Sequence, residues 1–217
     1  MKSLMTKQSD KLWTKDFILL SLSILLLSIA FYFLMPTLPI YVIDVLEMEN
    51  SKVGLVIAIY TLAALLIRPF AGMAVDMKGR KWILIISAIL FSVLFIGYKW
   101  ALLFVPLLFV RFLQGLQWGV STSAYFTAAV DIIPMKKRGR GIGYFGLAFN
   151  IAMAVGPAAG IFIMGDGRFN LLFISGLVLS LIGTSILFLV KFPRYERPAN
   201  LKFSWNGLFA KRTMPVT

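Results

Sequence analysis

The sequence predicts an all-α membrane protein with six transmembrane helices, and three observations support this prediction. The chain of 217 residues is 59% hydrophobic, and only 14% of its residues are charged. An average soluble domain has about a quarter of its residues charged. Its mean hydropathy is +0.87. Six apolar runs follow one another, each close to or above the roughly 20 residues that cross a bilayer as a helix.

The six apolar runs are separated by short polar segments. They cover residues 17–43, 53–75, 82–98, 100–130, 141–165 and 169–190. None alternates polar and apolar residues as a transmembrane β-strand does. The first run is uncharged and too long for a cleaved signal peptide, so we expect it to remain as a helix. Residues 1–16 form an N-terminal segment, and residues 191–217 form a tail that begins a linker.

Lysine and arginine occur mainly in every second connecting segment. On the side of the two termini they are Lys2, Lys7, Lys11, Lys15, Lys78, Arg80, Lys81, Lys136, Lys137, Arg138, Arg140, Lys191, Arg194, Arg197, Lys202, Lys211 and Arg212. The alternate loops hold only Lys52, Lys99 and Arg168. We expect a multi-pass protein of the cell (plasma) membrane, and the positive-inside rule predicts that both of its termini lie in the cytoplasm. The same distribution accounts for the net charge of +13 without a nucleic-acid partner.

The composition also excludes several kinds of chemistry. The chain has no cysteine and no histidine. Disulfides, thiolate nucleophiles, most transition-metal sites and the commonest general base are thereby removed. No Gly-rich Lys loop for nucleotide phosphates is present. We therefore expect neither an enzyme nor a cofactor or metal site.

A short turn dense in charge and glycine joins the second and third runs. Topology requires its basic residues but not the acid at the membrane boundary. The residues Gly72, Asp76, Gly79, Arg80 and Lys81 resemble the signature between the second and third helices of the major facilitator superfamily. Met77 stands where that family usually has a basic residue. An acid beside a basic turn can latch one of two conformations, so the turn is a candidate inner gate.

The fourth run contains an arginine about a third of the way along its length. Arg111, Gln114 and Gly115 resemble the family's fourth-helix pattern, and helical spacing places Trp118 and Tyr125 on the same face. A charge inside a span is costly unless it meets water, a partner or a substrate. A structural arginine bonded to backbone carbonyls is the alternative. In proton-coupled members of the family, the resemblance assigns this arginine to proton or substrate coupling.

The end of the fourth run resembles the family's inner turn between the fourth and fifth helices. Asp131, Pro134, Arg138 and Gly139 carry this likeness. The resemblance implies that Asp131 lies near Arg80 and completes a charge relay with Asp76, and Arg138 is counted among the inner-gate residues. A helix end with mixed surface charges is the alternative interpretation.

The fifth run contains a stripe of small residues. Gly156, Pro157 and Gly160 resemble the Gly-Pro-x-x-Gly motif of the family's drug/proton antiporters, although Ala152 and Ile161 depart from the usual glycines. Independently of the family, small residues four apart allow two helices to pack closely. Asn150 is the one amide in this run.

The resemblance implies the N-terminal half of a transporter, built as two three-helix repeats. Its implied function is proton-coupled efflux of small or lipophilic compounds, by alternating access around the first, second, fourth and fifth helices. Arg111, Gln114, Trp118, Tyr125 and Asn150 would line the route for the small-molecule substrate. A second six-helix half, as a separate chain or a second copy, is expected within the lipid bilayer. The alternatives are a truncated or split product that is inactive alone, and a membrane scaffold that transports nothing.

Overall fold

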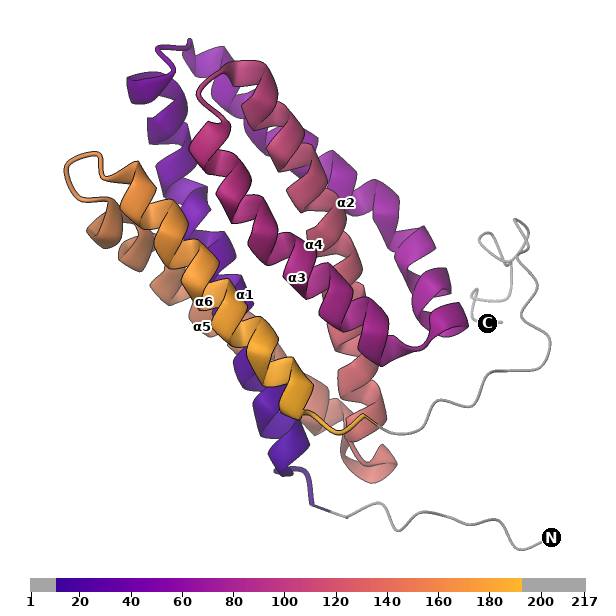
Figure 1. The fold of residues 1–217 in the computed structure, drawn as a ribbon. Coiled ribbons are helices and arrows are strands. Elements are labelled where there is room, and N and C mark those ends of the chain that lie inside the picture. Colours follow the sequence, from indigo (N-terminus) through magenta and orange to yellow (C-terminus); the bar gives the residue numbers. More distant parts are fainter. Residues whose placement is uncertain (1–10, 193–217) are drawn as a thin grey trace, which may run out of the picture.

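The structure, a computed structural model, describes residues 11–192, except for the side chains of residues 76–78. It is helical, and no strand occurs among the residues described (Figure 1). The long helices are α1 (Lys15–Ile40), α2 (Asn50–Lys78), α3 (Arg80–Trp100), α4 (Phe104–Ile132), α5 (Arg138–Met164) and α6 (Phe169–Leu189). A wider π turn, η1 (Tyr41–Val45), extends α1, and a 3₁₀ turn, η2 (Met135–Lys137), precedes α5.

Five of the described helices are long and apolar enough to cross a membrane. These are α1 with η1, α2, α3, η2 with α5, and α6. The remaining helix, α4, is as long as α2, at 29 residues, but carries Arg111 and Gln114 in its interior. It nevertheless lies inside the bundle, packed along α2 and α3.

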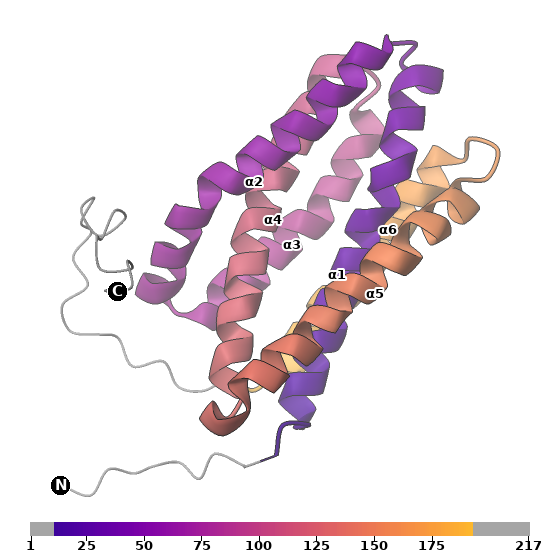
Figure 2. The ribbon, with the colours of Figure 1, turned by 180° about the vertical axis from the view of Figure 1, so that it is seen from behind.

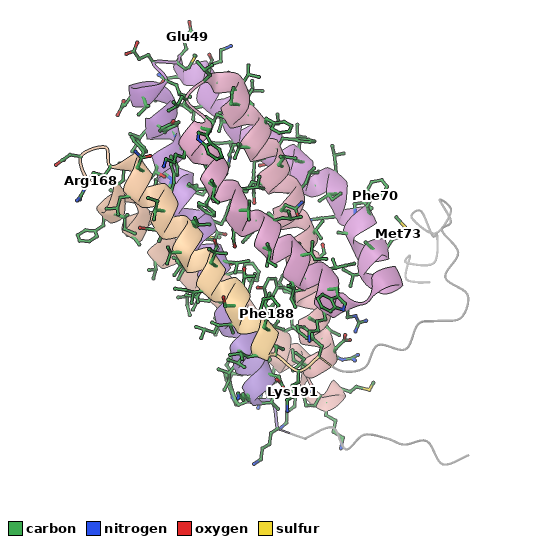
Figure 3. All side chains as sticks on the ribbon, in the orientation of Figure 1. Glu49, Phe70, Met73, Arg168, Phe188 and Lys191 are labelled. Atoms are coloured by element: carbon green, nitrogen blue, oxygen red, sulfur yellow. The ribbon has the colours of Figure 1, made fainter. Side chains whose placement is uncertain are left out.

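The six helices form two faces. α3 and α6 lie side by side on the face seen in Figure 1. The opposite face, in Figure 2, presents α2, α4, α1 and α5 in that order across the bundle. The main packed pairs are α1 with α5 and α6, α2 with α4, and α3 with α4 and α6. Apolar side chains such as Phe70 and Phe188 project outward from the bundle, as expected of a surface that meets lipid (Figure 3).

Local chemistry fixes several helix ends. Thr14 is the N-cap of α1, where its Oγ1 accepts a hydrogen bond from the Phe17 N–H at 3.3 Å. The Lys191 N–H donates to Asp16 Oδ1 at 2.8 Å, so the end of α6 is tied to the start of α1. Gly79 joins α2 directly to α3 with a φ of 87°, a left-handed conformation that favours glycine. The turn at Gly79 lies at the end of the bundle where both ends of the described chain lie (Figure 1).

The boundary between the third and fourth helices differs from the predicted one. The sequence placed the fourth run from residue 100, but Trp100 ends α3, and α4 begins only at Phe104. Trp100 is apolar, so hydropathy alone cannot separate it from the run that follows. Pro106 sits in the first turn of α4, where a missing N–H is tolerated.

Glycines bring two helix pairs into close contact. A Cβ placed on Gly160 of α5 would lie 2.7 Å from the Phe33 carbonyl oxygen of α1, and one on Gly156 would meet the Tyr32 Cβ. On α4, a Cβ on Gly119 would lie 2.6 Å from the Ala64 carbonyl oxygen of α2. The small residues of α5 thus let this helix approach α1 closely, and Gly119 does the same for α4 and α2.

A buried arginine in an aromatic cluster

Arg111 is the centre of the candidate site. Its side chain is 2% exposed, although it carries a guanidinium. Its Nη1 donates to Gln114 Oε1 at 2.9 Å and to the Tyr98 hydroxyl at 3.4 Å. Its Cζ lies 4.4 Å from the centroid of the Tyr60 ring, a cation–π distance. The buried positive charge is thus held by an amide, a phenol and a ring face.

No carboxylate of the described residues forms an ion pair with Arg111. The Tyr98 hydroxyl donates to Gln114 Oε1 at 2.5 Å, so this one oxygen accepts from both Tyr98 and Arg111. Three further polar atoms of the group, Arg111 Nε, Gln114 Nε2 and the Tyr60 hydroxyl, are buried without a hydrogen-bond partner in the described protein. Each of the three can donate a hydrogen bond. Taken together, the group has more donors than acceptors and suits an acceptor or an anion.

An aromatic cluster adjoins the arginine, and we define it as Phe31, Tyr60, Phe91, Trp118 and Phe149. Phe31 stacks between Tyr60 and Trp118, with centroids 5.1 and 4.6 Å apart. Phe91 and Phe149 approach Trp118 at 5.4 and 6.5 Å. The five rings come one each from α1, α2, α3, α4 and α5. The rings therefore form a continuous cluster that joins five helices, and Arg111 lies at its edge, against Tyr60.

The other two residues predicted for the substrate route lie apart from Arg111. The Tyr125 hydroxyl lies 2.6 Å from Ser23 Oγ, which donates to the Gly183 carbonyl at 2.6 Å. This buried chain of hydrogen bonds joins α4 to α1 and α6. Asn150 lies exposed on α5. The structure thus brings Arg111 and Gln114 together, places Trp118 in the aromatic cluster, and keeps Tyr125 and Asn150 elsewhere.

Of the residues predicted for the inner gate, the structure brings Arg80 and Asp131 together, beside the turn at Gly79. Arg80, at the start of α3, forms an ion pair with Asp131, near the end of α4; the two side chains are 23% and 22% exposed. Lys81 and Arg138 are exposed. Gly72 and Asp76 lie in α2, and the side chain of Asp76 lies outside the described part. The ion pair joins the two residues that the family resemblance places near each other, and its role as a gate stays a prediction.

Sequence reasoning missed Tyr60, Tyr98 and Ser23 as partners of the site. Tyr98 ends an otherwise bland run, and Ser23 is one of several serines in α1. The available signal was that Tyr60 and Tyr98 are the only tyrosines of their two runs. A tyrosine in an apolar helix usually finds a partner for its hydroxyl, as Tyr98 does, whereas Tyr60 contacts Arg111 through its ring face.

Comparison with known proteins places these features in a family. The model of the Major Facilitator Superfamily matches residues 20–214. Multidrug resistance protein 2 of Bacillus subtilis (strain 168) is 28% identical over 174 residues, which are 80% of this chain and 43% of that protein. Quinolone resistance protein NorA of Staphylococcus aureus (strain Mu50) is 30% identical over 149 residues, 69% of this chain and 38% of NorA. The chain thus spans less than half the length of these relatives.

A solved structure supports the same fold. The crystal structure of the human organic anion transporter MFSD10 (TETRAN) superposes with a TM-score of 0.73 and 17% sequence identity. The superposition covers 89% of this chain and 51% of that one.

Proposed function

The chain belongs to the major facilitator superfamily, and we propose that it forms one six-helix half of a secondary transporter that exports small or lipophilic compounds. Transport rather than catalysis is proposed because the site holds a buried cation and aromatic rings but no nucleophile–base pair. The efflux direction rests on the relatives, whose names describe multidrug and quinolone resistance. Protons are the proposed coupling ion, on the likeness of Gly156, Pro157 and Gly160 to drug/proton antiporters.

We propose that the half consists of two three-helix repeats, α1–α3 and α4–α6. The packed pairs support this division. If each helix is exchanged with its counterpart three places along, α1–α5 becomes α4–α2, and α1–α6 becomes α4–α3, while α3–α6 maps onto itself. The set of main contacts is unchanged by the exchange, as two related repeats require. In this arrangement α4 also crosses the membrane, together with the five apolar spans. Its polar residues face the inside of the bundle.

Arg111 carries the functional proposal. Burying a guanidinium in a helix bundle without a carboxylate partner costs free energy unless another group compensates its charge. The surplus donors around it suit an acceptor that comes and goes with the transport cycle, either an anionic group of a substrate or a carboxylate of a second half. The aromatic cluster beside it offers apolar surface for the lipophilic part of the same substrate.

The face shown in Figure 2 is the proposed contact with a second six-helix half. α2 and α5 lie at its two edges and are the least buried of the five apolar spans. The relatives are more than twice the length of the matched segment, which leaves room for such a half. This second half is supplied by further residues of the same protein, by another chain, or by a second copy of this chain in parallel orientation. The proposed location is the plasma membrane, with the Arg80–Asp131 end in the cytoplasm.

Uptake of a fluorescent quinolone, which carries a carboxylate, into inside-out vesicles under an imposed proton gradient tests the proposal. The chain is expressed alone and together with the remaining half of the Bacillus subtilis relative, which is also expressed by itself. We expect uptake in at least one arm that contains the chain, and a loss of at least tenfold in Arg111→Leu. Lys52→Leu is the matched control, because the Lys52 Nζ also lies over a ring, Phe104, at 5.7 Å, but outside the bundle interior.

Two results contradict the proposal. A correctly inserted chain with no uptake in either arm would favour a scaffold that transports nothing. If uptake is unchanged in both Arg111→Leu and Trp118→Leu, the arginine and its aromatic cluster take no part in transport.

A further inference from the structure

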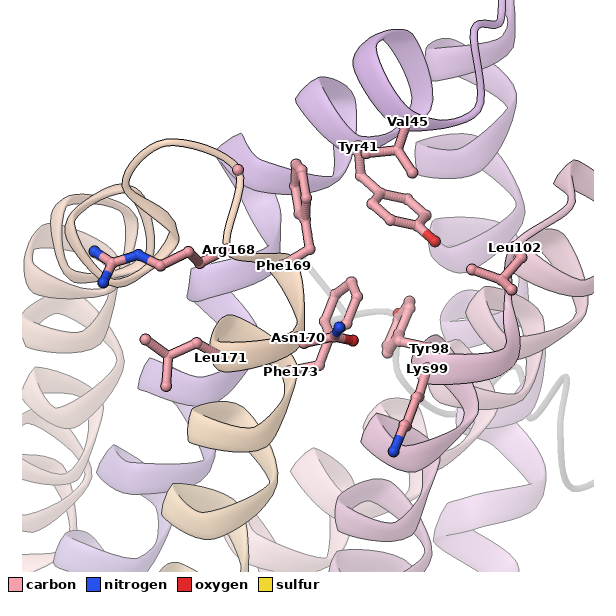
Figure 4. Close-up of a pocket in the computed structure, with 11 residues that line it drawn as sticks. Tyr41, Val45, Tyr98, Lys99, Leu102, Arg168, Phe169, Asn170, Leu171 and Phe173 are labelled. Carbon is pink, nitrogen blue, oxygen red and sulfur yellow. The ribbon is translucent and has the colours of Figure 1, made fainter.

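Two adjoining cavities lie between α3 and α6, at the end of the bundle opposite the ends of the described chain. Their volumes are about 470 and 430 Å³. Three residues, Lys99, Asn170 and Phe173, line both cavities. Figure 4 shows the first cavity, with Tyr41 and Tyr98 on one side and Phe169 on the other. The shared residues make the two cavities a single crevice, with polar groups at its middle.

The polar groups of the crevice favour an anion. Lys99 is exposed, and no carboxylate in the described range forms an ion pair with it. Asn170 provides an amide that can donate a hydrogen bond to the same ligand. Figure 4 shows both side chains at the gap between the two helices, while the guanidinium of Arg168 is directed away from it. One ammonium and one amide therefore face the crevice.

The second cavity is apolar beyond these groups. Phe95, Ile96, Ile174 and Leu177 line it, on the turns of α3 and α6 that lead away from Lys99 and toward the middle of the bundle. Ile96 and Ile174 are exposed there, on the face opposite the proposed contact with a second half. The crevice thus has a cation near a helix end and apolar residues beyond it, which is the order of polarity in an amphiphile that lies along a membrane helix.

We propose that the crevice between α3 and α6 binds a phospholipid with an anionic headgroup. Its phosphate contacts the Lys99 ammonium and the Asn170 amide, and an acyl chain lies along Phe95, Ile96, Ile174 and Leu177. The bilayer provides this ligand at the depth where the crevice opens. Apolar contacts with the acyl chain are the same for every headgroup. The choice of headgroup therefore depends on the charge of Lys99.

The experiment measures lipid binding to the purified chain of 217 residues by native mass spectrometry. Dioleoyl phosphatidylglycerol is titrated into the delipidated protein, with dioleoyl phosphatidylcholine and soluble glycerol phosphate as separate arms. We expect one tightly bound phosphatidylglycerol and weaker binding of the other two. Lys99→Gln is expected to lower the affinity by up to about fivefold, as for the loss of one exposed ion pair.

Two further variants separate the headgroup from the chain. Ile174→Trp fills the apolar part without changing the charge and is expected to lower the binding of both lipids. Lys52→Gln removes a cation from the same end of the bundle and is expected to leave binding unchanged. Size-exclusion chromatography and helical circular dichroism confirm that each variant is folded, which is expected because Lys99 and Ile174 are exposed.

Three results would overturn the proposal. Phosphatidylglycerol binding unchanged in both Lys99→Gln and Ile174→Trp would place the lipid elsewhere. Equal affinity for phosphatidylcholine would remove the role of Lys99. Equal affinity for glycerol phosphate would identify a site for a soluble anion rather than a lipid.

Discussion

Gly160→Ala is the substitution whose effect the structure defines most sharply. Gly160 lies on α5 where that helix meets α1. The added Cβ would lie 2.7 Å from the Phe33 carbonyl oxygen and 2.8 Å from the Phe33 Cα. Both atoms belong to the backbone, so no change of side-chain rotamer relieves the contact. The two helices must separate, and α1–α5 is one of the most extensive contacts in the bundle.

The expected cost follows from two opposing terms. Overpacking a close contact costs about 1–3 kcal/mol. Replacing a helical glycine with alanine returns up to about 1 kcal/mol of helix propensity. We therefore expect Gly160→Ala to lower the free energy of unfolding by up to about 2 kcal/mol, and by about 1–3 kcal/mol relative to a glycine-to-alanine change that meets no close contact. Gly143→Ala on the same helix is the control, because a Cβ there meets nothing within 4 Å, so only the favourable term applies.

The measurement is unfolding of the purified chain in mixed micelles by increasing SDS, followed by helical circular dichroism. Gly160→Ala should unfold at a lower SDS fraction than the wild type, and Gly143→Ala at the same or a higher one. If Gly160→Ala unfolds at or above the midpoint of Gly143→Ala, the close contact between α1 and α5 is refuted.

The remaining stability predictions concern two polar links between helices. Asp131→Asn should lower the free energy of unfolding by about 1 kcal/mol. This value lies between those of fully exposed and fully buried ion pairs, because about a fifth of each side chain of the Arg80–Asp131 pair is exposed. The exchanged variant Arg80→Asp with Asp131→Arg should recover part of the loss, and a double-mutant cycle without coupling would contradict the pair. Tyr125→Phe should cost about 0.6 kcal/mol, typical of a hydrogen bond between membrane helices. Ser23→Ala should cost more, because both the Tyr125 hydroxyl and the Gly183 carbonyl lose a partner; equal losses in thermal unfolding would count against the chain of bonds.

The apolar runs located all six long helices, because lipid-compatible length and composition are properties of the sequence alone. Their ends were less predictable. α1 begins where Thr14 caps it, and Trp100 belongs to α3 rather than α4. Caps and turns depend on backbone angles, to which hydropathy is insensitive. The polarity of α4 was equally plain in the sequence, but only the packed bundle shows that Arg111 is buried.

Contacts within one helix were predictable from spacing, and contacts between helices were not. Arg111 and Gln114 are three residues apart, so helical geometry alone places them together. Tyr98 lies 13 residues from Arg111 in the chain and reaches it only because α3 packs antiparallel to α4. The ring of Tyr60 comes from α2, and no spacing rule relates it to Arg111. The proximity of Arg80 and Asp131 came from family resemblance rather than from any pattern in the residues.

The three residues of the fourth-helix pattern act as one unit in this structure. Arg111 provides the charge, and Gln114 provides the oxygen that accepts from it. Gly115 lacks a Cβ that would otherwise meet the Tyr60 carbonyl oxygen, so the backbone of α2 can approach α4 at that residue. This close approach brings the Tyr60 ring to 4.4 Å from the guanidinium. A larger residue at position 115 would move that ring away and leave the buried charge with less compensation. The glycine is therefore as much a part of the arginine site as the side chains that touch it.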